Sequence, residues 1–274
     1  MANKHKTLTL DEIEQYRLSH YLTRLLDEIA TEFNIEKSKI RVLDFGCGRG
    51  LLTAKFLALG YEAYGVDIEE YVLSKGRDAL KQLHADPDKH LIKITPGNDT
   101  PFPDNFFHLI ITRDVLEHVE NLDTMLKEYH RIMIPQGKSF HSFIAKWNPR
   151  EPHLGLRFIH WLPKNWLRYW YLWLSYNKLP YWIEFENLSK KERIAFVYNY
   201  SINQTFYRSI SEIESSCKKN KLQARFYTNT SPSRLLKLLF PFFYFFPKPT
   251  KRFWTWKENT FNTVILYISK PGTL

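Results

Sequence analysis

The sequence contains few cysteines and no apolar stretch long enough to cross a bilayer. Two cysteines among 274 residues, Cys47 and Cys217, supply neither a disulfide framework nor a cysteine-rich metal cluster, which favours a reducing, cytoplasmic compartment. The first nine residues are polar and include lysine, unlike the apolar centre of a secretory signal peptide. The apolar stretch at 235–246 is only 12 residues long, whereas a membrane-spanning helix needs about 20.

Acidic residues and tryptophan are unevenly distributed, and Asp123 is the last aspartate. Residues 1–144 contain 18 Lys and Arg against 22 Asp and Glu, whereas residues 145–274 contain 21 against 7. All eight tryptophans and 30 of the 44 aromatic residues lie beyond residue 144. A basic, aromatic half is suited to phosphate groups or to an anionic lipid surface. Simple drift in composition is the alternative interpretation.

Three glycines at alternate positions follow a short apolar run. Residues 41–50 read Arg-Val-Leu-Asp-Phe-Gly-Cys-Gly-Arg-Gly, and an apolar helical pattern begins at Leu51. A buried strand, a glycine turn and a helix start form half of a nucleotide-binding βαβ unit. The dinucleotide fingerprint places its third glycine three residues after its second, but Gly50 comes two residues after Gly48. With the carboxylate of Asp44 before the turn, this spacing favours a ligand with a cationic or amine-bearing end.

Strand-like and helix-like segments alternate after an amphipathic N-terminal helix, which is expected from Thr9 to Phe33 with Thr9 and Glu12 as a capping box. Strands are expected at 41–45, 62–66, 90–95, 107–112 and 139–143, and helices at 51–60, 69–83 and 114–132. This alternation predicts an α/β fold with a doubly wound parallel sheet. Asp67 ends the second strand beside the glycine turn, where a carboxylate can accept both hydroxyls of a ribose. Asp67 can also cap the next helix, and the two roles are compatible, but its position 17 residues after Gly50 favours the ribose contact.

The motifs in this order resemble the class I S-adenosylmethionine-dependent methyltransferases. The matching segments are residues 42–50, 65–67, 101–104, 115–119 and 131–137. The resemblance implies a Rossmann-like sheet of seven strands in the order 3-2-1-4-5-7-6, with strand 7 antiparallel, and S-adenosyl-L-methionine as the cofactor. His108 departs from the family, which usually has aspartate there.

The resemblance also implies where the cofactor is held. The residues expected to contact it are Asp44, Gly46, Cys47, Gly48 and Gly50 at the methionine and ribose end, Asp67 and Ile68 at the ribose, Asn98 or Asp99 at the adenine, and Thr112 and Arg113 beside the sulfonium. The loop after the third expected strand is short, which puts Pro96 at the position where the family usually has an acidic adenine contact.

The chain is expected to divide into an N-terminal helix (1–34), a cofactor-binding core (35–144), a helical, aromatic cap insertion (145–204) and a segment that completes the core (205–274). That last segment should supply a helix at 211–222, capped by Ser211 and Glu214, and strands at 222–227 and 262–268. A second insertion, 231–261, contains the apolar stretch 235–246 with basic flanks. It fits a peripheral contact with an anionic membrane, a lid or a dimer contact.

Methyl transfer to oxygen benefits from a base near the acceptor proton, and histidine is the residue most often used. His153 in the cap and His118 after the fourth strand are the candidates, although a lone histidine is more often structural. Glu151 would orient His153 or bind a sugar hydroxyl. The sequence has no zinc spacing and no obvious carboxylate cluster, so no metal site is predicted. Motifs of adenine or cytosine methylation are missing, which makes a nucleic-acid acceptor a poor fit.

The leading hypothesis is O-methylation of a sugar hydroxyl on a surface glycan or its phosphate-bearing or lipid-linked precursor. The phrase Glu-Pro-His-Leu-Gly at 151–155 resembles bacterial methyltransferases encoded with surface-glycan genes. The alternatives are a small-molecule or lipid (quinone-like) methyltransferase and a non-catalytic, membrane-associated binding protein of the same fold. Neither the acceptor nor the oligomeric state follows from the sequence.

Overall fold

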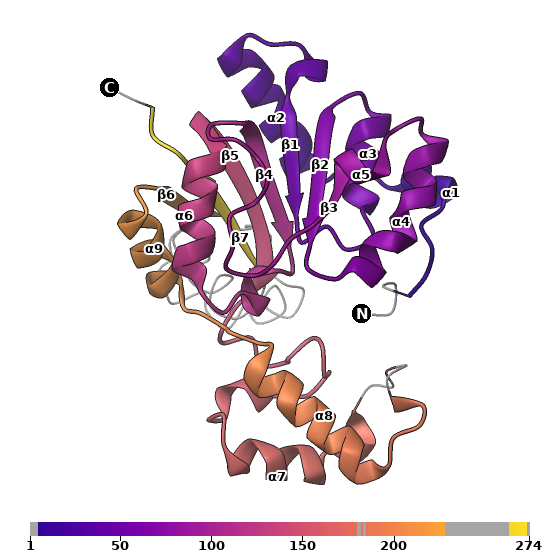
Figure 1. The fold of residues 1–274 in the computed structure, drawn as a ribbon. Coiled ribbons are helices and arrows are strands. Elements are labelled where there is room, and N and C mark those ends of the chain that lie inside the picture. The colour runs from indigo at the N-terminus through magenta and orange to yellow at the C-terminus, as the bar shows by residue number, and fades with distance from the viewer. Residues whose placement is uncertain (1–4, 180–181, 183–184, 228–262, 273–274) are drawn as a thin grey trace, which may run out of the picture.

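A computed structural model describes residues 5–179, 182, 185–227 and 263–272. Its centre is a seven-stranded sheet in the order β3-β2-β1-β4-β5-β7-β6 (Figure 1), which confirms the predicted fold class. The strands are β1 (Arg41–Phe45), β2 (Glu62–Asp67), β3 (Leu91–Lys93), β4 (Phe107–Arg113), β5 (Met133–Ile144), β6 (Gln223–Tyr227) and β7 (Thr263–Ser269). β1 pairs in parallel with β2 and β4, whereas β7 runs antiparallel to β5 and β6.

Helices cover both faces of the sheet, because consecutive residues of the central strands point to opposite faces and are apolar on each. The helices are α1 (Leu10–Gln15), α2 (His20–Phe33), α3 (Leu51–Ala58), α4 (Glu70–Gln82), α5 (Pro87–His90), α6 (Leu122–Ile132), α7 (Trp166–Leu174), α8 (Lys190–Asn203) and α9 (Ile210–Lys219), with 3-10 turns η1 (Lys37–Lys39), η2 (Leu116–His118), η3 (Ile159–Trp161) and η4 (Tyr176–Lys178). Val42 of β1 packs with α2 and α3. Its neighbour Leu43 packs on the opposite face with α6 and α9.

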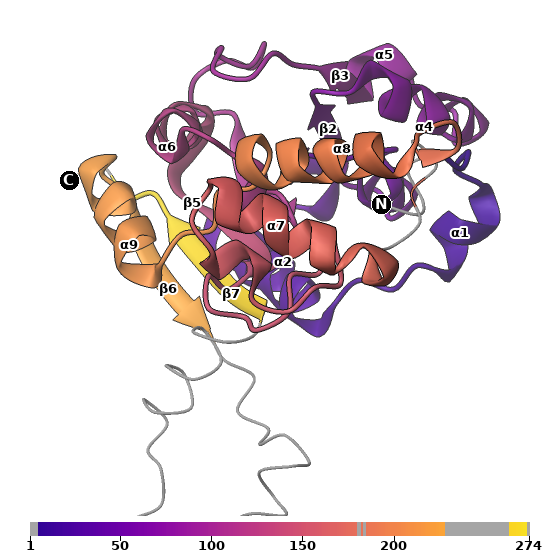
Figure 2. The same ribbon diagram turned by 90° about the horizontal axis from the view of Figure 1, so that it is seen from below.

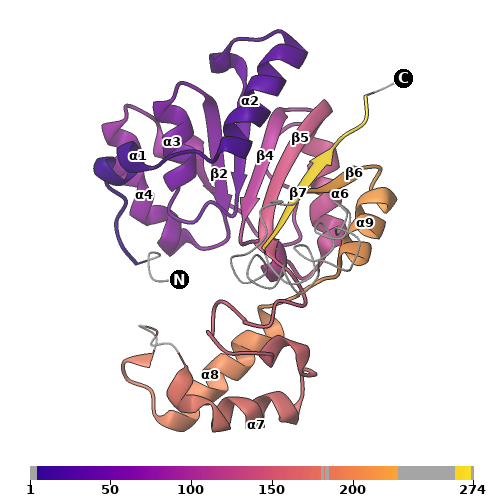
Figure 3. The same ribbon diagram turned by 180° about the vertical axis from the view of Figure 1, so that it is seen from behind.

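The cap lies beyond the carboxyl ends of the strands, where β5 leaves the sheet (Figures 1 and 3). Seen from that side, α7 and α8 cross the sheet next to each other (Figure 2). They enclose an apolar cluster of their own, which includes Leu172 and Val197, both fully buried. Ser189 and Glu192 form a capping box that starts α8. The two helices therefore lie where ligands bind in open α/β sheets. The boundaries of the insertion, 145–204, stay a prediction.

Two predicted helices are interrupted. The N-terminal helix breaks after α1 because Tyr16 has an extended backbone (φ −64°, ψ 127°), and Ser19 then caps α2 by accepting from the amide of Leu22 at 3.3 Å. The capping box of Thr9 and Glu12 is present as predicted. After β4, Asp114 has φ +55°, so the chain makes the short turn η2 and α6 begins only after Asn121.

Other boundaries also differ from the predictions. The final helix begins with a capping box of Ser209 and Glu212, so the predicted pair Ser211 and Glu214 was wrong. β5 begins at Met133 rather than at residue 139, and β3 is confined to three residues. The apolar stretch 235–246 lies outside the described residues. Within the described part of the chain, no helix has the length and apolar character that crossing a membrane requires.

Candidate active site

The glycine turn between β1 and α3 has a left-handed backbone at all three glycines, with φ of +76°, +56° and +78° at Gly46, Gly48 and Gly50. Their surroundings differ. A Cβ on Gly46 would lie 2.5 Å from Cγ2 of Val115, so packing as well as conformation requires glycine there. A Cβ on Gly48 would meet only Val72, at 3.9 Å. The turn is therefore open beside Gly48, where close approach of a ligand to the backbone is possible.

Asp67 fastens the glycine turn to the end of β2. Its Oδ2 accepts from the amide of Gly48 at 2.7 Å, and its Oδ1 accepts from the amide of Glu69 at 3.0 Å, at the start of α4. Each carboxylate oxygen has a further lone pair, so the predicted ribose contact is compatible with both bonds. Ile68, the next residue, has 52% of its surface exposed at the same edge.

Asp44 is buried at the end of β1 near a partly buried arginine. Burial raises the pKa of Asp44 to about 6, and the positive charge of Arg113 opposes that rise. Nη1 of Arg113 donates to the hydroxyl of Tyr16 at 2.5 Å, which ties the end of α1 to β4. The hydroxyl of Thr112 is fully buried and pairs with Nδ1 of His141 at 2.7 Å inside the sheet. Of the two residues predicted beside the sulfonium, Arg113 is the one that reaches other elements at this edge.

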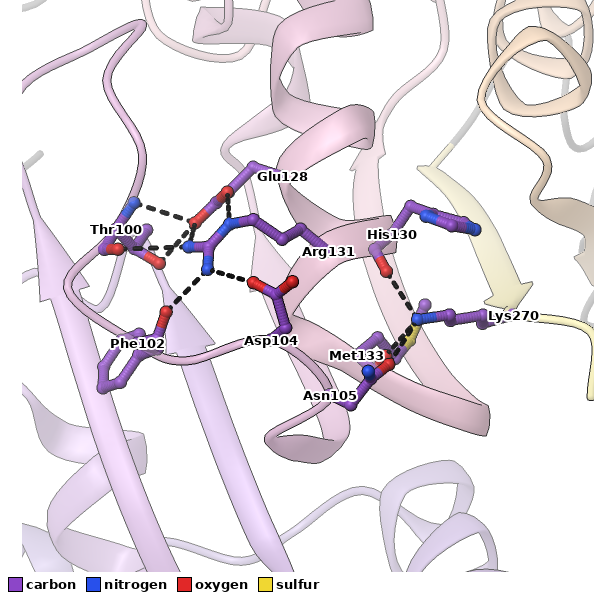
Figure 4. A network of polar contacts seen from close by, with 9 residues as sticks. All are labelled: Thr100, Phe102, Asp104, Asn105, Glu128, His130, Arg131, Met133 and Lys270. Carbon is purple, nitrogen blue, oxygen red and sulfur yellow. Dashed lines mark hydrogen bonds and ion pairs between the residues drawn. The ribbon is translucent and has the colours of Figure 1, made fainter. Parts of the chain in front are cut away.

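The predicted adenine residues, Asn98 and Asp99, are exposed in the loop after β3. An ion pair from α6 holds the end of this loop (Figure 4). Oε1 of Glu128 accepts from the amide of Thr100 at 2.8 Å and from Nη2 of Arg131 at 2.7 Å. Arg131 also donates to the carbonyl of Phe102 at 2.8 Å. The loop is thus anchored just beyond Asn98 and Asp99.

His118, His153 and Glu151 are brought together between core and cap. Nε2 of His118 lies 3.3 Å from Nε2 of His153. Nδ1 of His118 is 2.6 Å from the carbonyl of Gln204, and Nδ1 of His153 is 2.8 Å from Oε1 of Glu151. Glu151 is 2% exposed and also accepts from the hydroxyl of Tyr207 at 2.5 Å. These bonds orient both rings, so neither histidine is isolated from other polar groups.

In this cluster, burial and the contact between Glu151 and His153 shift the pKa values of these two residues in opposite directions. Burial raises the pKa of Glu151, but the hydrogen bond from His153 and its positive charge outweigh burial, so the pKa is lowered overall. Burial acts to lower the pKa of His153, yet its hydrogen bond to Glu151 leaves that pKa raised. Burial lowers the pKa of His118. The paired rings therefore differ in basicity, with His153 the stronger base.

Arg208 positions the turn that carries His118, a role that the sequence did not reveal. Its Nη2 donates to the carbonyls of Val119 and Glu120, both at 2.6 Å, and its Nη1 donates to the carbonyl of Leu116 at 3.1 Å. The segment returning from the cap thus fixes η2 from outside. Val115, which precedes η2, contacts Gly46, so the histidine cluster and the glycine turn are joined through a few residues. Tyr207 was also missed, because its contact with Glu151 spans 56 positions.

Comparison with known proteins supports the interpretation of the core. Residues 43–140 match the methyltransferase domain family. The ubiquinone/menaquinone biosynthesis C-methyltransferase of Vibrio cholerae is 35% identical over 101 residues, covering 36% of this chain and 38% of the relative. The ubiquinone biosynthesis O-methyltransferase of Mesorhizobium japonicum is 28% identical over 158 residues, covering 53% and 60%. The chain thus spans less than two thirds of the length of these curated relatives.

A solved structure extends the likeness to most of the chain. Phosphoethanolamine N-methyltransferase 2 of Haemonchus contortus, in complex with S-adenosyl-L-methionine, superposes with a TM-score of 0.52 at 17% identity and covers 91% of this chain and 52% of its own. This likeness concerns the fold. The family match contains the glycine turn, Asp67 and His118, whereas Glu151 and His153 lie beyond it. Residues 43–140 thus match a methyltransferase domain, and the sheet around them has the strand order expected of the class I S-adenosylmethionine-dependent methyltransferase fold.

Proposed function

We propose that the protein transfers a methyl group from S-adenosylmethionine to a hydroxyl oxygen. The observation that carries this proposal is the cluster of His118, His153 and Glu151 at the carboxyl edge of the sheet, joined to the glycine turn through Val115. A carbon or amine acceptor has less need of two oriented imidazoles, whereas a hydroxyl must lose its proton to become a good nucleophile. Most of the remaining catalysis is positioning of donor and acceptor.

The proposed reaction is an in-line displacement. The acceptor oxygen forms a bond to the methyl carbon, the carbon–sulfur bond breaks, and sulfur keeps the electron pair as a neutral thioether. The hydroxyl proton leaves through the histidine cluster to solvent. Asp44, Asp67 and the open turn at Gly48 hold the donor in this proposal, with Arg113 near the reacting end.

Two acceptor classes are proposed, in line with the basic and aromatic second half of the chain. A sugar hydroxyl on a lipid-linked or phosphate-bearing glycan precursor is supported by the phrase at 151–155. A quinone-like lipid is supported by the curated relatives, whose names place them in ubiquinone or menaquinone biosynthesis. Both acceptors would be presented at a membrane surface.

Cofactor binding is the first test, because it separates a methyltransferase from a non-catalytic binding protein of the same fold. Calorimetry with S-adenosylmethionine and with its demethylated product should detect binding of both to the wild type. Asp67→Asn should weaken the binding of both compounds, because it removes the negative charge of the carboxylate that accepts from the amide of Gly48 and, in this proposal, from the ribose. Asp78→Asn, exposed on α4, is the control and should bind as the wild type does. No binding to either compound by folded wild type would refute the enzyme proposal.

The acceptor can be found with a donor carrying ¹³C in its methyl group. Wild type and His153→Asn are incubated with bacterial membrane extract, and the labelled fraction is separated into glycan and isoprenoid-lipid pools. We expect a methoxyl resonance in one pool with the wild type and a much weaker one with His153→Asn. A C-methyl or N-methyl resonance would instead contradict O-methylation.

A further inference from the structure

Glu117 is a buried carboxylate in η2, 2% exposed. Among the described residues, neither Oε1 nor Oε2 makes a hydrogen bond of full geometry; burial raises the pKa of Glu117, and the backbone amides of Glu117 itself and of Ile144 act against that rise. The hydroxyl of Tyr200, beside the two histidine rings, is also buried and unpartnered. Leaving a buried carboxylate uncompensated is costly. Such a group is expected either to take up a proton or to face a cation that neutralises it.

The two histidines present lone pairs toward each other. A carbonyl only accepts, so the proton of His118 must be on Nδ1, where it bonds to Gln204. Glu151 receives bonds from Tyr207 and from the amide of Leu154, so it acts as an acceptor and places the proton of His153 on Nδ1 as well. In the neutral rings, both Nε2 atoms then carry lone pairs only 3.3 Å apart. This arrangement is repulsive unless a positive charge lies between them, which is either a metal cation or a second proton on His153 that donates to Nε2 of His118.

We infer that Glu117, His118 and His153 form a binding site for a divalent transition-metal cation. One ligand atom from each of the three residues lies within 4.8 Å of the other two, and the two Nε2 atoms are 3.3 Å apart. Two imidazoles and one carboxylate suit borderline ions such as Zn²⁺, Fe²⁺ or Mn²⁺, and they leave coordination positions open. Ligating histidines characteristically donate their other ring N–H to a carboxylate or a backbone carbonyl. His153 does the first with Glu151, and His118 does the second with Gln204.

The spacing of the ligands explains why no metal motif is visible in the sequence. Glu117 and His118 are adjacent in η2, the turn that follows β4, whereas His153 comes 35 residues after His118 and belongs to the cap. The site exists only when cap and core meet. Arg208 and the carbonyl of Gln204, both in the segment returning from the cap, hold the η2 side in place.

The role of the cation rests on the proposed function. An open coordination position would take the acceptor hydroxyl, lower its pKa and hold the oxygen in line with the methyl group. The hydroxyl proton then passes to solvent water, and the oxygen–carbon bond forms as the carbon–sulfur bond breaks. The histidines would act through the cation rather than as free bases. The rival arrangement is a proton shared between the two Nε2 atoms, which binds no metal.

Metal binding can be measured without the acceptor. Full-length protein is stripped with a chelator and titrated with Co²⁺, followed by its visible absorbance, and then with Zn²⁺ in competition. We expect one ion per chain, with Zn²⁺ tighter than Mn²⁺ and Mg²⁺ the weakest. Glu117→Gln and His118→Gln should lose the Co²⁺ spectrum. Glu151→Gln, which removes only the support of His153, should weaken binding by about 10–100-fold.

Two controls separate loss of ligand from loss of fold. Glu120→Gln and His84→Asn change exposed residues and should bind Co²⁺ as the wild type does. In stripped protein, Glu117→Gln should melt no lower than the wild type, because it removes the negative charge of a buried carboxylate. Folded wild type that binds Co²⁺ and Zn²⁺ no better than folded Glu117→Gln would overturn the site.

Activity distinguishes this inference from the proposed function. Methyl transfer that persists undiminished in chelator-stripped protein would overturn the cation's role while leaving O-methylation intact. Stoichiometric metal binding that Glu117→Gln abolishes, without methyl transfer to any extract pool, would support the site and count against the proposed function.

Discussion

His108 shows how one residue can replace another of different charge within a familiar motif. It is 7% exposed at the start of β4, and its Nδ1 accepts from the backbone amide of Arg41 at 3.1 Å. Its ring meets Phe33 edge to face, with centroids 5.4 Å apart. The site thus requires a hydrogen-bond acceptor, which a neutral imidazole provides.

The neutral state of His108 makes stability depend on pH. Burial, followed by the charge of Arg41, lowers the pKa of His108 to about 4. Because the folded pKa lies below the unfolded value of about 6.5, its contribution is complete above pH 6.5 and is lost as pH falls toward 4. We expect His108→Gln, which keeps an acceptor but does not titrate, to lose less unfolding free energy over this range. The difference should be at most about 3 kcal/mol.

Urea unfolding of wild type and His108→Gln at matched pH values tests this expectation. Asp44 and Glu117 contribute in the opposite direction, because burial raises the pKa of Asp44 to about 6 and that of Glu117 to about 7. Those contributions are shared by both proteins and cancel in the comparison. His84→Asn, which removes an exposed histidine at φ +56°, should follow the wild type. Parallel curves for all three proteins would contradict the assignment.

Individual residues were predictable where strand position fixed them. Asp44 and Asp67 were identified because they end neighbouring parallel strands, and the structure places both at that edge. The environment of Glu117 was not predictable. Its burial depends on residues 206–208 returning from the cap, which no local pattern connects to η2.

The helices and strands were largely predictable from local sequence signals, and the errors in their predicted boundaries share one cause. Residues 209–214 contain two overlapping Ser-x-x-Glu patterns, and the structure uses the earlier one. Glu212 also pairs with Lys146 from the end of β5 at 3.2 Å, a tertiary contact that favours this register. Asp114 similarly takes φ +55° while its amide bonds to Ser142 of β5. Tertiary contacts decided where these elements begin.

The loop after β3 depends on one ion pair, so Arg131→Met should affect stability strongly (Figure 4). Glu128 is 7% exposed on its side chain, and losing Arg131 would leave its carboxylate without its charged partner. We expect a loss of about 2–3 kcal/mol in unfolding free energy, somewhat less than for a fully buried pair because Arg131 is partly exposed.

The matched control is Arg24→Met, whose pair with Glu28 on α2 is exposed on both sides. It should cost less than about 1 kcal/mol. Both values come from urea denaturation at neutral pH. Equal costs for the two substitutions would mean that the Glu128–Arg131 pair does not anchor the loop.

At the scale of the molecule, part of the basic and aromatic half of the chain is exposed to solvent on the cap. Trp166, Trp170 and Leu174 of α7 are 65%, 54% and 73% exposed. Lys190 of α8 lies 5.2 Å from the ring centre of Trp173. Exposed tryptophan and lysine together suit the headgroup layer of an anionic bilayer. The sequence analysis allowed a membrane contact, a lid or a dimer contact for 235–246, which lies outside the described residues, whereas the described surface is on α7.

Vesicle sedimentation tests this surface. We expect the protein to sediment with vesicles containing anionic lipid at low salt, and less at high salt because exposed charges are screened. The double variant Trp166→Ser/Trp170→Ser should reduce sedimentation, whereas Trp147→Ser, which changes an exposed tryptophan outside α7, should not. If all variants sediment alike, α7 is not the contact.

The position of β7 has a consequence for how the chain is made. Among the described strands, β6 pairs only with β7, and β5 has β7 as its partner on the side away from β4. During synthesis from the N-terminus, β6 and α9 emerge before residues 263–269. Until then β5 presents an open edge, to which other chains can add. A ribosome that stalls before residue 263 would therefore hold a nascent chain in which β1 to β5 can already pair with one another. The free edge of β5 would still be able to pair with a strand of another chain.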